Sequence, residues 1–111
     1  MSEYYRSEDL KKFGQIGRHG KAQADSFFTY YNQITGQDGA LTRREKSLIA
    51  LAISHAQKCP YCIDAYTTAC LETGSNPEQM MEAVHVAAAM QAGITLVHSV
   101  QMQNKLEQMV L

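Results

Sequence analysis

Apolar residues recur along most of this chain at the three- and four-residue steps of an amphipathic helix. In residues 7–28, Leu10, Phe13 and Ile16 follow this spacing, and Ser7 is placed to cap the helix N-terminus ahead of two acidic residues. Each glycine in this stretch weakens a helix by about 1 kcal/mol relative to alanine. We therefore expect a loose or broken first helix that gains order from packing.

The next apolar segment, residues 48–53, is almost continuous, so its periodicity does not distinguish a buried helix from a buried strand. Thr42 and Glu45 have the spacing of a capping box, in which each side chain satisfies a backbone amide of the first turn. This box and the alanines favour a helix that reaches about residue 58 and is buried on most sides.

Prolines and glycines divide the second half of the chain. Pro60 predicts that one helix ends near Cys59 and that another runs over residues 59–73, with Gly74 after its last turn. Asn76, followed by proline and then by glutamine at the third helical position, marks a further helix start. We expect that helix to stop at Gly93.

A last apolar stripe predicts a helix over residues 95–109, and no strand pattern is present. The expected fold is all-α with about five helices. The length of 111 residues fits a single domain over residues 1–111.

Composition narrows the function classes. Ten Lys and Arg against eleven Asp and Glu give a net charge of −1, so there is no basic excess to hold nucleic acid or an anionic membrane. No apolar run reaches the roughly 18 residues that a bilayer span needs, and the N-terminus has no apolar signal core. Three cysteines are too few for a disulfide scaffold. We expect a cytoplasmic protein with no nucleic-acid or membrane partner.

Cys59 and Cys62 form a Cys-x-x-Cys pair at a predicted helix start. This spacing brings two sulfurs within bonding reach, and the free amides and dipole of the helix start stabilise a thiolate. The pair can therefore cycle between dithiol and disulfide. One alternative is a buried pair of small residues at a helix joint. Another is zinc, but the sequence offers no second cysteine pair or closely spaced histidines to complete a site.

Two neighbours could move protons. His55 lies four residues before Cys59, and Ser47 eight residues before His55, so the three share a helix face. His55 could act as a base near neutral pH, or it could be a core histidine bonded to a backbone carbonyl. Tyr66, four residues after Cys62, could donate to a peroxide oxygen or to sulfur, or it could simply be packed.

Other features fit structural roles. Cys70 lies about 12 Å along a helix from Cys62 and cannot bridge to it, so it is a buried structural cysteine or an interface thiol. His85 and His98 fit core or interface positions, or the lining of the active pocket. The aromatic residues at 27–31 and the apolar run at 48–53 offer more apolar surface than one small protomer needs, which predicts an obligate homo-oligomer.

Three segments carry a family resemblance: residues 45–54 (EKSLIALAIS), 59–66 (CPYCIDAY) and 82–90 (EAVHVAAAM). Together they closely resemble the carboxymuconolactone decarboxylase-like superfamily, and specifically its alkylhydroperoxidase (AhpD-like) branch. The cysteine block with a third cysteine also resembles a peroxidase-like subgroup associated with arsenosugar biosynthesis.

The resemblance implies an all-helical protomer in a trimer or hexamer, with a peroxide-reducing thiol cycle and no cofactor. In AhpD-like enzymes the second cysteine attacks the peroxide and the first resolves the sulfenic acid as a disulfide. Carried over, Cys62 is peroxidatic and Cys59 is resolving.

The sequence departs from the family pattern at two positions. Ser47 stands where the family has a glutamate, twelve residues before the first cysteine, and Tyr66 stands where it has a histidine. Glu45 lies about 200° around the helix from the glutamate position, so it cannot simply replace it. His55 is the available replacement base, with Tyr66 as hydrogen-bond donor.

The sequence thus predicts a thiol-dependent, peroxidase-like oxidoreductase. The predicted catalytic set is Cys62, Cys59, His55 and Tyr66, with no metal and no cofactor, acting on a small-molecule peroxide or disulfide and recycled by a dithiol reductant. One alternative is a lyase of the carboxymuconolactone decarboxylase type. The other is a non-catalytic oligomer whose thiols bind a metal or a trivalent arsenical.

Overall fold

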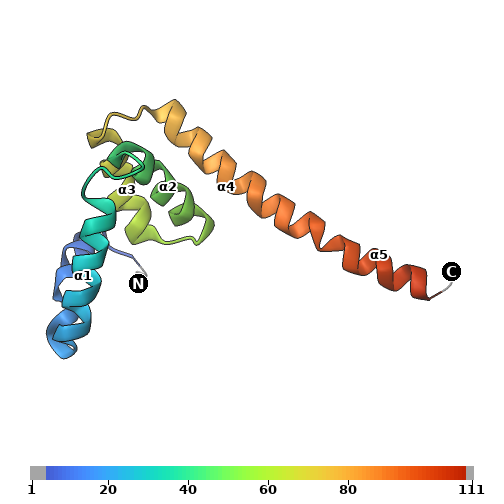
Figure 1. Ribbon diagram of the computed structural model, residues 1–111, viewed down its shortest axis with the longest axis horizontal. Helices are drawn as coiled ribbons and strands as arrows, with labels where there is room; N and C mark the ends of the chain where they lie inside the picture. The colour runs from blue at the N-terminus through green and yellow to red at the C-terminus, as the bar shows by residue number, and fades with distance from the viewer. Residues whose placement is uncertain (1–4, 110–111) are drawn as a thin grey trace.

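The computed structural model of the protein describes residues 5–109. Within that range, helices are the only regular secondary structure (Figure 1). The predicted all-α fold is therefore confirmed. In chain order the elements are a 3-10 helix η1 (Ser7–His19) and α-helices α1 (Lys21–Thr35), α2 (Arg43–Ala56), α3 (Pro60–Glu72), α4 (Pro77–Val97) and α5 (Ser99–Gln108). The predicted absence of a signal core at the N-terminus rests partly on residues 1–4, which lie outside the described range.

The three predicted helix starts in the middle of the chain are confirmed. Thr42 and Glu45 form a complete capping box at α2, and Asn76 and Gln79 form one at α4. At α3 the N-cap residue is Cys59, and its sulfur accepts the backbone N–H of Cys62. The sequence thus places the first cysteine of the pair at the point where free helix amides are available.

Helices α2 and α3 have the same backbone geometry at their C-terminal ends. At the end of α2, the Cys59 amide donates to the Ser54 carbonyl at 2.9 Å, and Lys58 has a positive φ of 56°. At the end of α3, the Ser75 amide closes the same loop, with Gly74 at a φ of 96°. Both are Schellman motifs, in which glycine is usual at the positive-φ position. The motif at Lys58 fixes where the chain enters the cysteine pair.

The first helical region differs from the prediction. A 3-10 helix ends at His19, and a separate α1 extends to Thr35, beyond the expected end at residue 28. The expected loose or broken helix is confirmed, with the break at Gly20. The predicted cap at Ser7 is wrong: the N-cap position is Arg6, and the Ser7 hydroxyl donates to a distant carboxylate instead.

The predicted helix end at Gly93 is also wrong. Helix α4 continues through Gly93 to Val97, and the chain turns only at His98 before α5 begins. A Cβ at position 93 would meet no atom within 4 Å, so no close contact or turn requires glycine there. One glycine weakens a long helix without ending it, because the propensity cost is only about 1 kcal/mol.

Residues 5–87 are called the body from here on, and helix α2 lies at its centre. Helix α2 packs against α3 and the first half of α4. The helix η1 packs on α1 and α3. The buried residues of α2 are Ser47, Leu51 and Ser54, and the small side chains of the two serines allow a close approach of the neighbouring helices. The expectation that the run at 48–53 is buried on most sides is wrong for a single protomer. Ile49 and Ile53 are about half exposed, because no other helix within residues 5–109 covers them fully.

Residues 88–109, called the arm from here on, project from the body as a nearly continuous rod (Figure 1). The radius of gyration is 19.0 Å, whereas a compact chain of this length would have about 13 Å. Every residue of the arm except Ser99 is exposed. By length and composition, residues 77–108 could cross a bilayer. The sequence predicted no such segment, because polar residues such as His85 and Gln91 interrupt every apolar run in this region.

Candidate functional site

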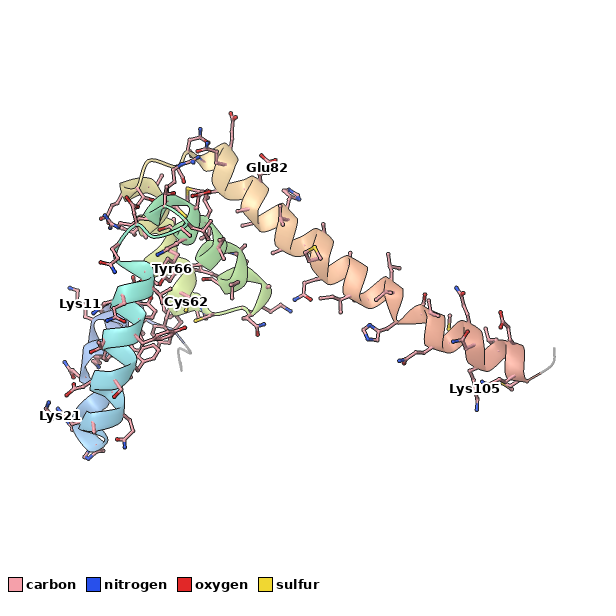
Figure 2. All side chains as sticks on the ribbon, in the orientation of Figure 1. Lys11, Lys21, Cys62, Tyr66, Glu82 and Lys105 are labelled. Carbon is pink, nitrogen blue, oxygen red and sulfur yellow. The ribbon has the colours of Figure 1, made fainter. Side chains whose placement is uncertain are left out.

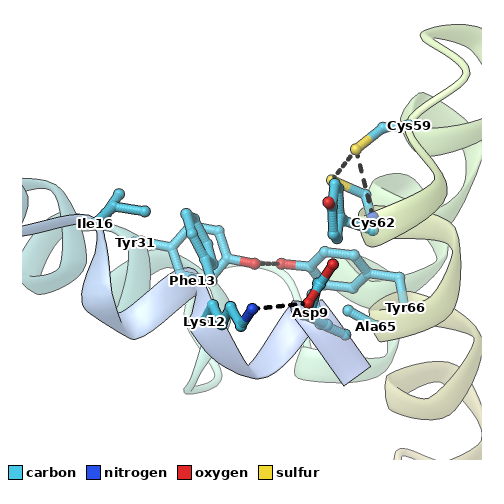
Figure 3. A pocket seen from close by; sticks show the side chains of 11 residues that line it. Asp9, Lys12, Phe13, Ile16, Tyr31, Cys59, Cys62, Ala65 and Tyr66 are labelled. Atoms are coloured by element: carbon cyan, nitrogen blue, oxygen red, sulfur yellow. Dashed lines mark hydrogen bonds and ion pairs between the residues drawn. The ribbon is translucent and has the colours of Figure 1, made fainter. Parts of the chain in front are cut away.

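A cavity of about 500 Å³ lies between η1, α1 and the start of α3, and both sulfurs of the cysteine pair line it (Figure 3). Its lining residues are Asp9, Leu10, Lys12, Phe13, Ile16, Tyr31, Cys59, Tyr61, Cys62, Ala65 and Tyr66. Most of these side chains are apolar or aromatic. The two sulfurs and the phenol groups of three tyrosines are the polar groups with reactive hydrogens, as expected of a small-molecule site.

The two sulfurs lie 2.9 Å apart as free thiols in hydrogen-bond contact. The backbone N–H of Cys62 donates to the Cys59 sulfur at 3.4 Å. Because a disulfide bond is about 2.05 Å long, a sub-ångström movement of each sulfur would close it. The predicted proximity of the pair is confirmed, and the geometry allows a dithiol to become a disulfide without moving either helix.

The two cysteines differ in how readily they ionise. The hydrogen bond with the Cys62 thiol, followed by the bond that the Cys62 backbone N–H donates, lowers the pKa of Cys59 below its ordinary value. Burial, followed by the hydrogen bond with Cys59, raises the pKa of Cys62 to about 11. Of the two thiols, Cys59 is therefore the one that loses its proton more readily. The expectation that the helix start favours a thiolate holds for Cys59 and is reversed for Cys62.

Two tyrosines form the floor of the cavity. The hydroxyls of Tyr31 on α1 and Tyr66 on α3 are hydrogen-bonded to each other, and the ring of Tyr66 lies beside Cys62 in Figure 3. Burial and the Tyr31 hydroxyl raise the pKa of Tyr66, so its phenol keeps its proton at neutral pH. Tyr66 bonds to Tyr31 in the resting protein, and the pair presents phenolic hydrogens next to the sulfurs.

His55 lies elsewhere. Its Nδ1 is 2.9 Å from the Leu51 carbonyl oxygen, the backbone contact that the sequence analysis gave as the alternative to a catalytic base. It lines a second cavity of about 330 Å³, formed mainly by α2 and α4, and is not among the residues around the sulfurs. Ser47 is buried in the body. The structure thus brings together Cys59, Cys62 and Tyr66, and places His55 apart from them.

Sequence reasoning did not identify two contributors to this site. The sequence groups Tyr31 with the aromatic residues at 27–31, and its ring packs within the protomer against Phe13 and Phe27. The wall formed by η1 was not expected at all. The signal that could have revealed this wall is the apolar stripe at Leu10, Phe13 and Ile16. By itself this spacing predicts a helix but not what the helix packs against.

The remaining cysteine and histidines lie away from the cavity. Cys70 is fully buried, which raises the pKa of its thiol and fits the structural alternative. His85 and His98 are exposed on α4 and at its end, and His98 Nδ1 contacts the Ile94 carbonyl oxygen. Within residues 5–109, no three His, Cys, Asp or Glu side chains gather as they would around a metal ion.

Comparison of the sequence with known proteins identifies a family. The sequence profile of the carboxymuconolactone decarboxylase family matches residues 22–104. An "uncharacterized protein 4 in cox locus" from Paracoccus denitrificans is 40% identical over 86 residues, which cover 78% of this chain and 77% of that protein. No solved structure matches at a significant level.

Proposed function

Because the chain belongs to the carboxymuconolactone decarboxylase family, we propose that it is a thiol peroxidase in which Cys59 and Cys62 alternate between dithiol and disulfide. The observation that carries this proposal is the contact of two free sulfurs, 2.9 Å apart, on the wall of one apolar cavity. A lyase of the same family would have no use for two thiols at this distance. A dithiol so placed can give two electrons to a peroxide and become a disulfide.

The proposed reaction begins with the Cys59 thiolate. Its sulfur attacks the terminal oxygen of a hydroperoxide ROOH, the O–O bond breaks, and Cys59 becomes a sulfenic acid while RO⁻ leaves. The Cys62 sulfur then attacks the sulfenic sulfur, forming the disulfide and releasing water after it loses its thiol proton. An external dithiol restores both thiols. The sum is ROOH plus two thiol hydrogens giving ROH, water and a disulfide.

The Tyr31–Tyr66 pair supplies the proton that the leaving oxygen needs. A phenol with a raised pKa is protonated at neutral pH and hydrogen-bonds well to a developing alkoxide. Tyr66 lies beside Cys62 in the cavity, and Tyr31 can share the charge through the hydroxyl contact. The pair thus takes the role that the missing family histidine would have had.

The order of attack is the reverse of the one that the resemblance implies. There Cys62 attacks first, but its pKa of about 11 leaves it protonated at neutral pH, whereas the pKa of Cys59 is lowered. Trapping the sulfenic acid with a dimedone reagent decides between the two orders. The structural order predicts a trapped adduct on Cys59 in Cys62→Ser, and the family order predicts one on Cys62 in Cys59→Ser.

The test of the function is peroxide turnover with a dithiol donor. We expect Cys59→Ser and Cys62→Ser each to lose at least about 100-fold of the wild-type rate, because one sulfur cannot complete the cycle. Cys70→Ser is the matched control and should retain turnover, since Cys70 does not line the cavity. Turnover that persists in the Cys59→Ser/Cys62→Ser double variant would overturn the proposal.

His55→Ala belongs in the same assay. Its imidazole contacts a backbone carbonyl and lines the other cavity, so we expect a loss below about threefold, against the 100-fold or more that removal of a catalytic base costs. A larger loss would restore His55 as the base that the sequence predicted. Lactone decarboxylation that survives loss of both cysteines would favour the lyase. Stoichiometric retention of an arsenical without turnover would favour a binding protein.

We also propose that the working protein is a cytoplasmic homo-oligomer, a trimer or hexamer, without nucleic-acid or membrane partners. The protomer exposes 8768 Å² of surface, about 2,600 Å² more than the roughly 6,100 Å² of a compact monomer of this mass. An excess of this size is comparable to obligate subunit interfaces. The free thiols suit a reducing compartment.

A further inference from the structure

The segment η1 precedes the family-matched residues, yet it forms much of the sulfur cavity. The family match begins at residue 22, whereas η1 ends at His19. Asp9, Leu10, Lys12, Phe13 and Ile16 supply five of the eleven lining residues, and in Figure 3 their helix faces Tyr66 and the cysteines across the cavity. One wall of the site is therefore formed by residues that lie outside the family match.

This wall is fastened to the helix that carries the cysteines. The hydroxyls of Tyr5 and Ser7 both donate to the Asp64 carboxylate on α3, each at 2.5 Å. The Tyr5 ring also packs edge-on against Tyr61, with ring centroids 4.9 Å apart. Hydrogen bonds to an ionised acceptor are among the stronger ones in proteins. Asp64 thus holds the beginning of η1 against the first turns of α3.

The helix itself needs this support. It forms a 3-10 helix of 13 residues, whereas such runs seldom exceed three or four residues because their hydrogen bonds are poorly aligned. Its packing is aromatic: Phe13 contacts Phe28 and Phe27, at centroid distances of 5.0 and 5.9 Å. The position of η1 therefore depends on side-chain contacts at its start, through Tyr5 and Ser7, and at its middle, through Phe13.

The surface that η1 turns toward the sulfurs is apolar and carries no unpaired charge. Leu10, Phe13 and Ile16 are its hydrocarbon members. The two charged members neutralise each other, since Lys12 Nζ lies 3.2 Å from Asp9 Oδ1. An uncharged molecule with an apolar body would lose little hydration on entering, whereas a carboxylate or ammonium would leave water without a partner.

We infer that η1 is the substrate-selecting wall of the site, favouring an uncharged hydroperoxide with an apolar body over hydrogen peroxide. Leu10, Phe13 and Ile16 determine specificity, and Asp64 is a positioning residue that acts by holding η1. This inference rests on the proposed peroxidase function for the peroxide itself. The preference for apolar thiol reagents that it entails does not depend on turnover.

The first experiment compares kcat/KM for cumene hydroperoxide and for hydrogen peroxide. Wild type should favour cumene hydroperoxide, and Phe13→Ala should lower that selectivity ratio about tenfold, as expected for loss of one large apolar contact. Ile16→Asn repeats the test at a half-exposed residue that the fold tolerates more easily. Lys11→Ala, on η1 but outside the cavity lining, should leave the ratio unchanged. An unchanged ratio in both Phe13→Ala and Ile16→Asn would overturn the inference.

The second experiment needs no enzyme activity. Alkylation of Cys59 by N-phenylmaleimide should be faster than by the charged N-carboxyethylmaleimide, after each rate is divided by its rate with a free thiol. Asp64→Ala should lower this preference at least threefold, because η1 loses both hydroxyl contacts with α3. Absence of the preference in wild type, or its full retention in Asp64→Ala, would contradict the role of η1. Absent turnover with an intact preference would reject the peroxidase proposal alone.

Discussion

The body and the arm of this protein are built on opposite principles. In the body, capping boxes, aromatic contacts and paired hydroxyls give most polar groups a partner and surround one cavity with reactive sulfurs. In the arm, residues 88–109 carry a bare apolar surface, with Leu96 69% exposed and only Lys105 and Glu107 as charged groups. The side chains of both regions are drawn in Figure 2.

This contrast supports the proposal that the two regions have different partners. The body satisfies its own chemistry within one chain, because the sulfurs, the phenols and η1 contact each other directly. The arm leaves in water the apolar area that a soluble fold would bury, which costs about 25 cal/mol per Å². We propose that another copy of the chain buries the arm and removes this apolar area from water. Catalysis and assembly should then be separable by mutation.

The largest effect should come from charging the arm. Leu96→Asp combined with Val100→Asp places two carboxylates one turn apart on residues that are both exposed in the protomer. Burying an unpaired charge costs several kcal/mol, so we expect the assembly to dissociate. Sedimentation velocity at micromolar concentration measures this, with Gln101→Asp as a one-charge control at a polar position. A wild-type monomer, or an arm that partitions into lipid vesicles, would contradict burial by a second copy.

A change confined to the body should alter chemistry without altering assembly. Tyr66→Phe removes the phenol next to Cys62, and we expect peroxide turnover to fall about 100-fold, the usual contribution of a positioned proton donor. Tyr30→Phe is the control, since Tyr30 is exposed on α1 and does not line the cavity. Unchanged turnover in Tyr66→Phe, with the sedimentation coefficient of wild type, would remove the tyrosine pair from the mechanism.

Ionisation of Cys59 should respond to its partner more modestly. Cys62→Ala deletes the thiol hydrogen bond that is the main cause of the lowered Cys59 pKa, so that pKa should rise. The thiolate fraction below the pKa then falls, and iodoacetamide labelling of Cys59 at pH 7 should slow about threefold to tenfold. Cys62→Ser retains a hydroxyl donor and should show a smaller change. A faster reaction in Cys62→Ala would contradict the assigned thiolate.

The smallest expected effect is on the stability of the arm, tested by a substitution at Gly93. In the isolated protomer, Gly93→Ala should stabilise α4 by about 0.5–1 kcal/mol, because the added Cβ meets no atom within 4 Å. If a partner helix approaches closely at this position, the same substitution weakens the assembly instead. Thermal unfolding at two protein concentrations distinguishes these results. Identical unfolding of variant and wild type would show that Gly93 has neither role.

The sequence predicted local structure well where a side chain bonds its own backbone. Thr42, Asn76 and Cys59 each lie at the helix starts expected of them, because caps are local interactions that spacing reveals. The two errors at Ser7 and Gly93 have a different cause. The Ser7 hydroxyl donates to Asp64, 57 residues away in sequence, instead of capping the helix. At Gly93 no neighbouring atom lies within 4 Å of an added Cβ, so no contact there ends the helix.

For the site, the cysteine pair and Tyr66 could be predicted, while Tyr31 and the η1 wall could not. Cys59, Cys62 and Tyr66 lie on consecutive turns of one helix, so spacing alone brings them together. Tyr31 reaches Tyr66 from another helix, and η1 reaches α3 through Tyr5 and Asp64, contacts that only the tertiary fold creates. His55 shared a helix face with Cys59 on paper, but the chain turns at Lys58 between them.

The most direct test of the central claim is a titration of the reduced protein with peroxide in the absence of any reductant. One equivalent of peroxide per protomer should remove two of the three thiols, with Cys59 and Cys62 joined in one intramolecular disulfide and Cys70 still free. Peptide mapping by mass spectrometry identifies the bond. Three free thiols after several equivalents of peroxide, or a disulfide that includes Cys70, would contradict the account.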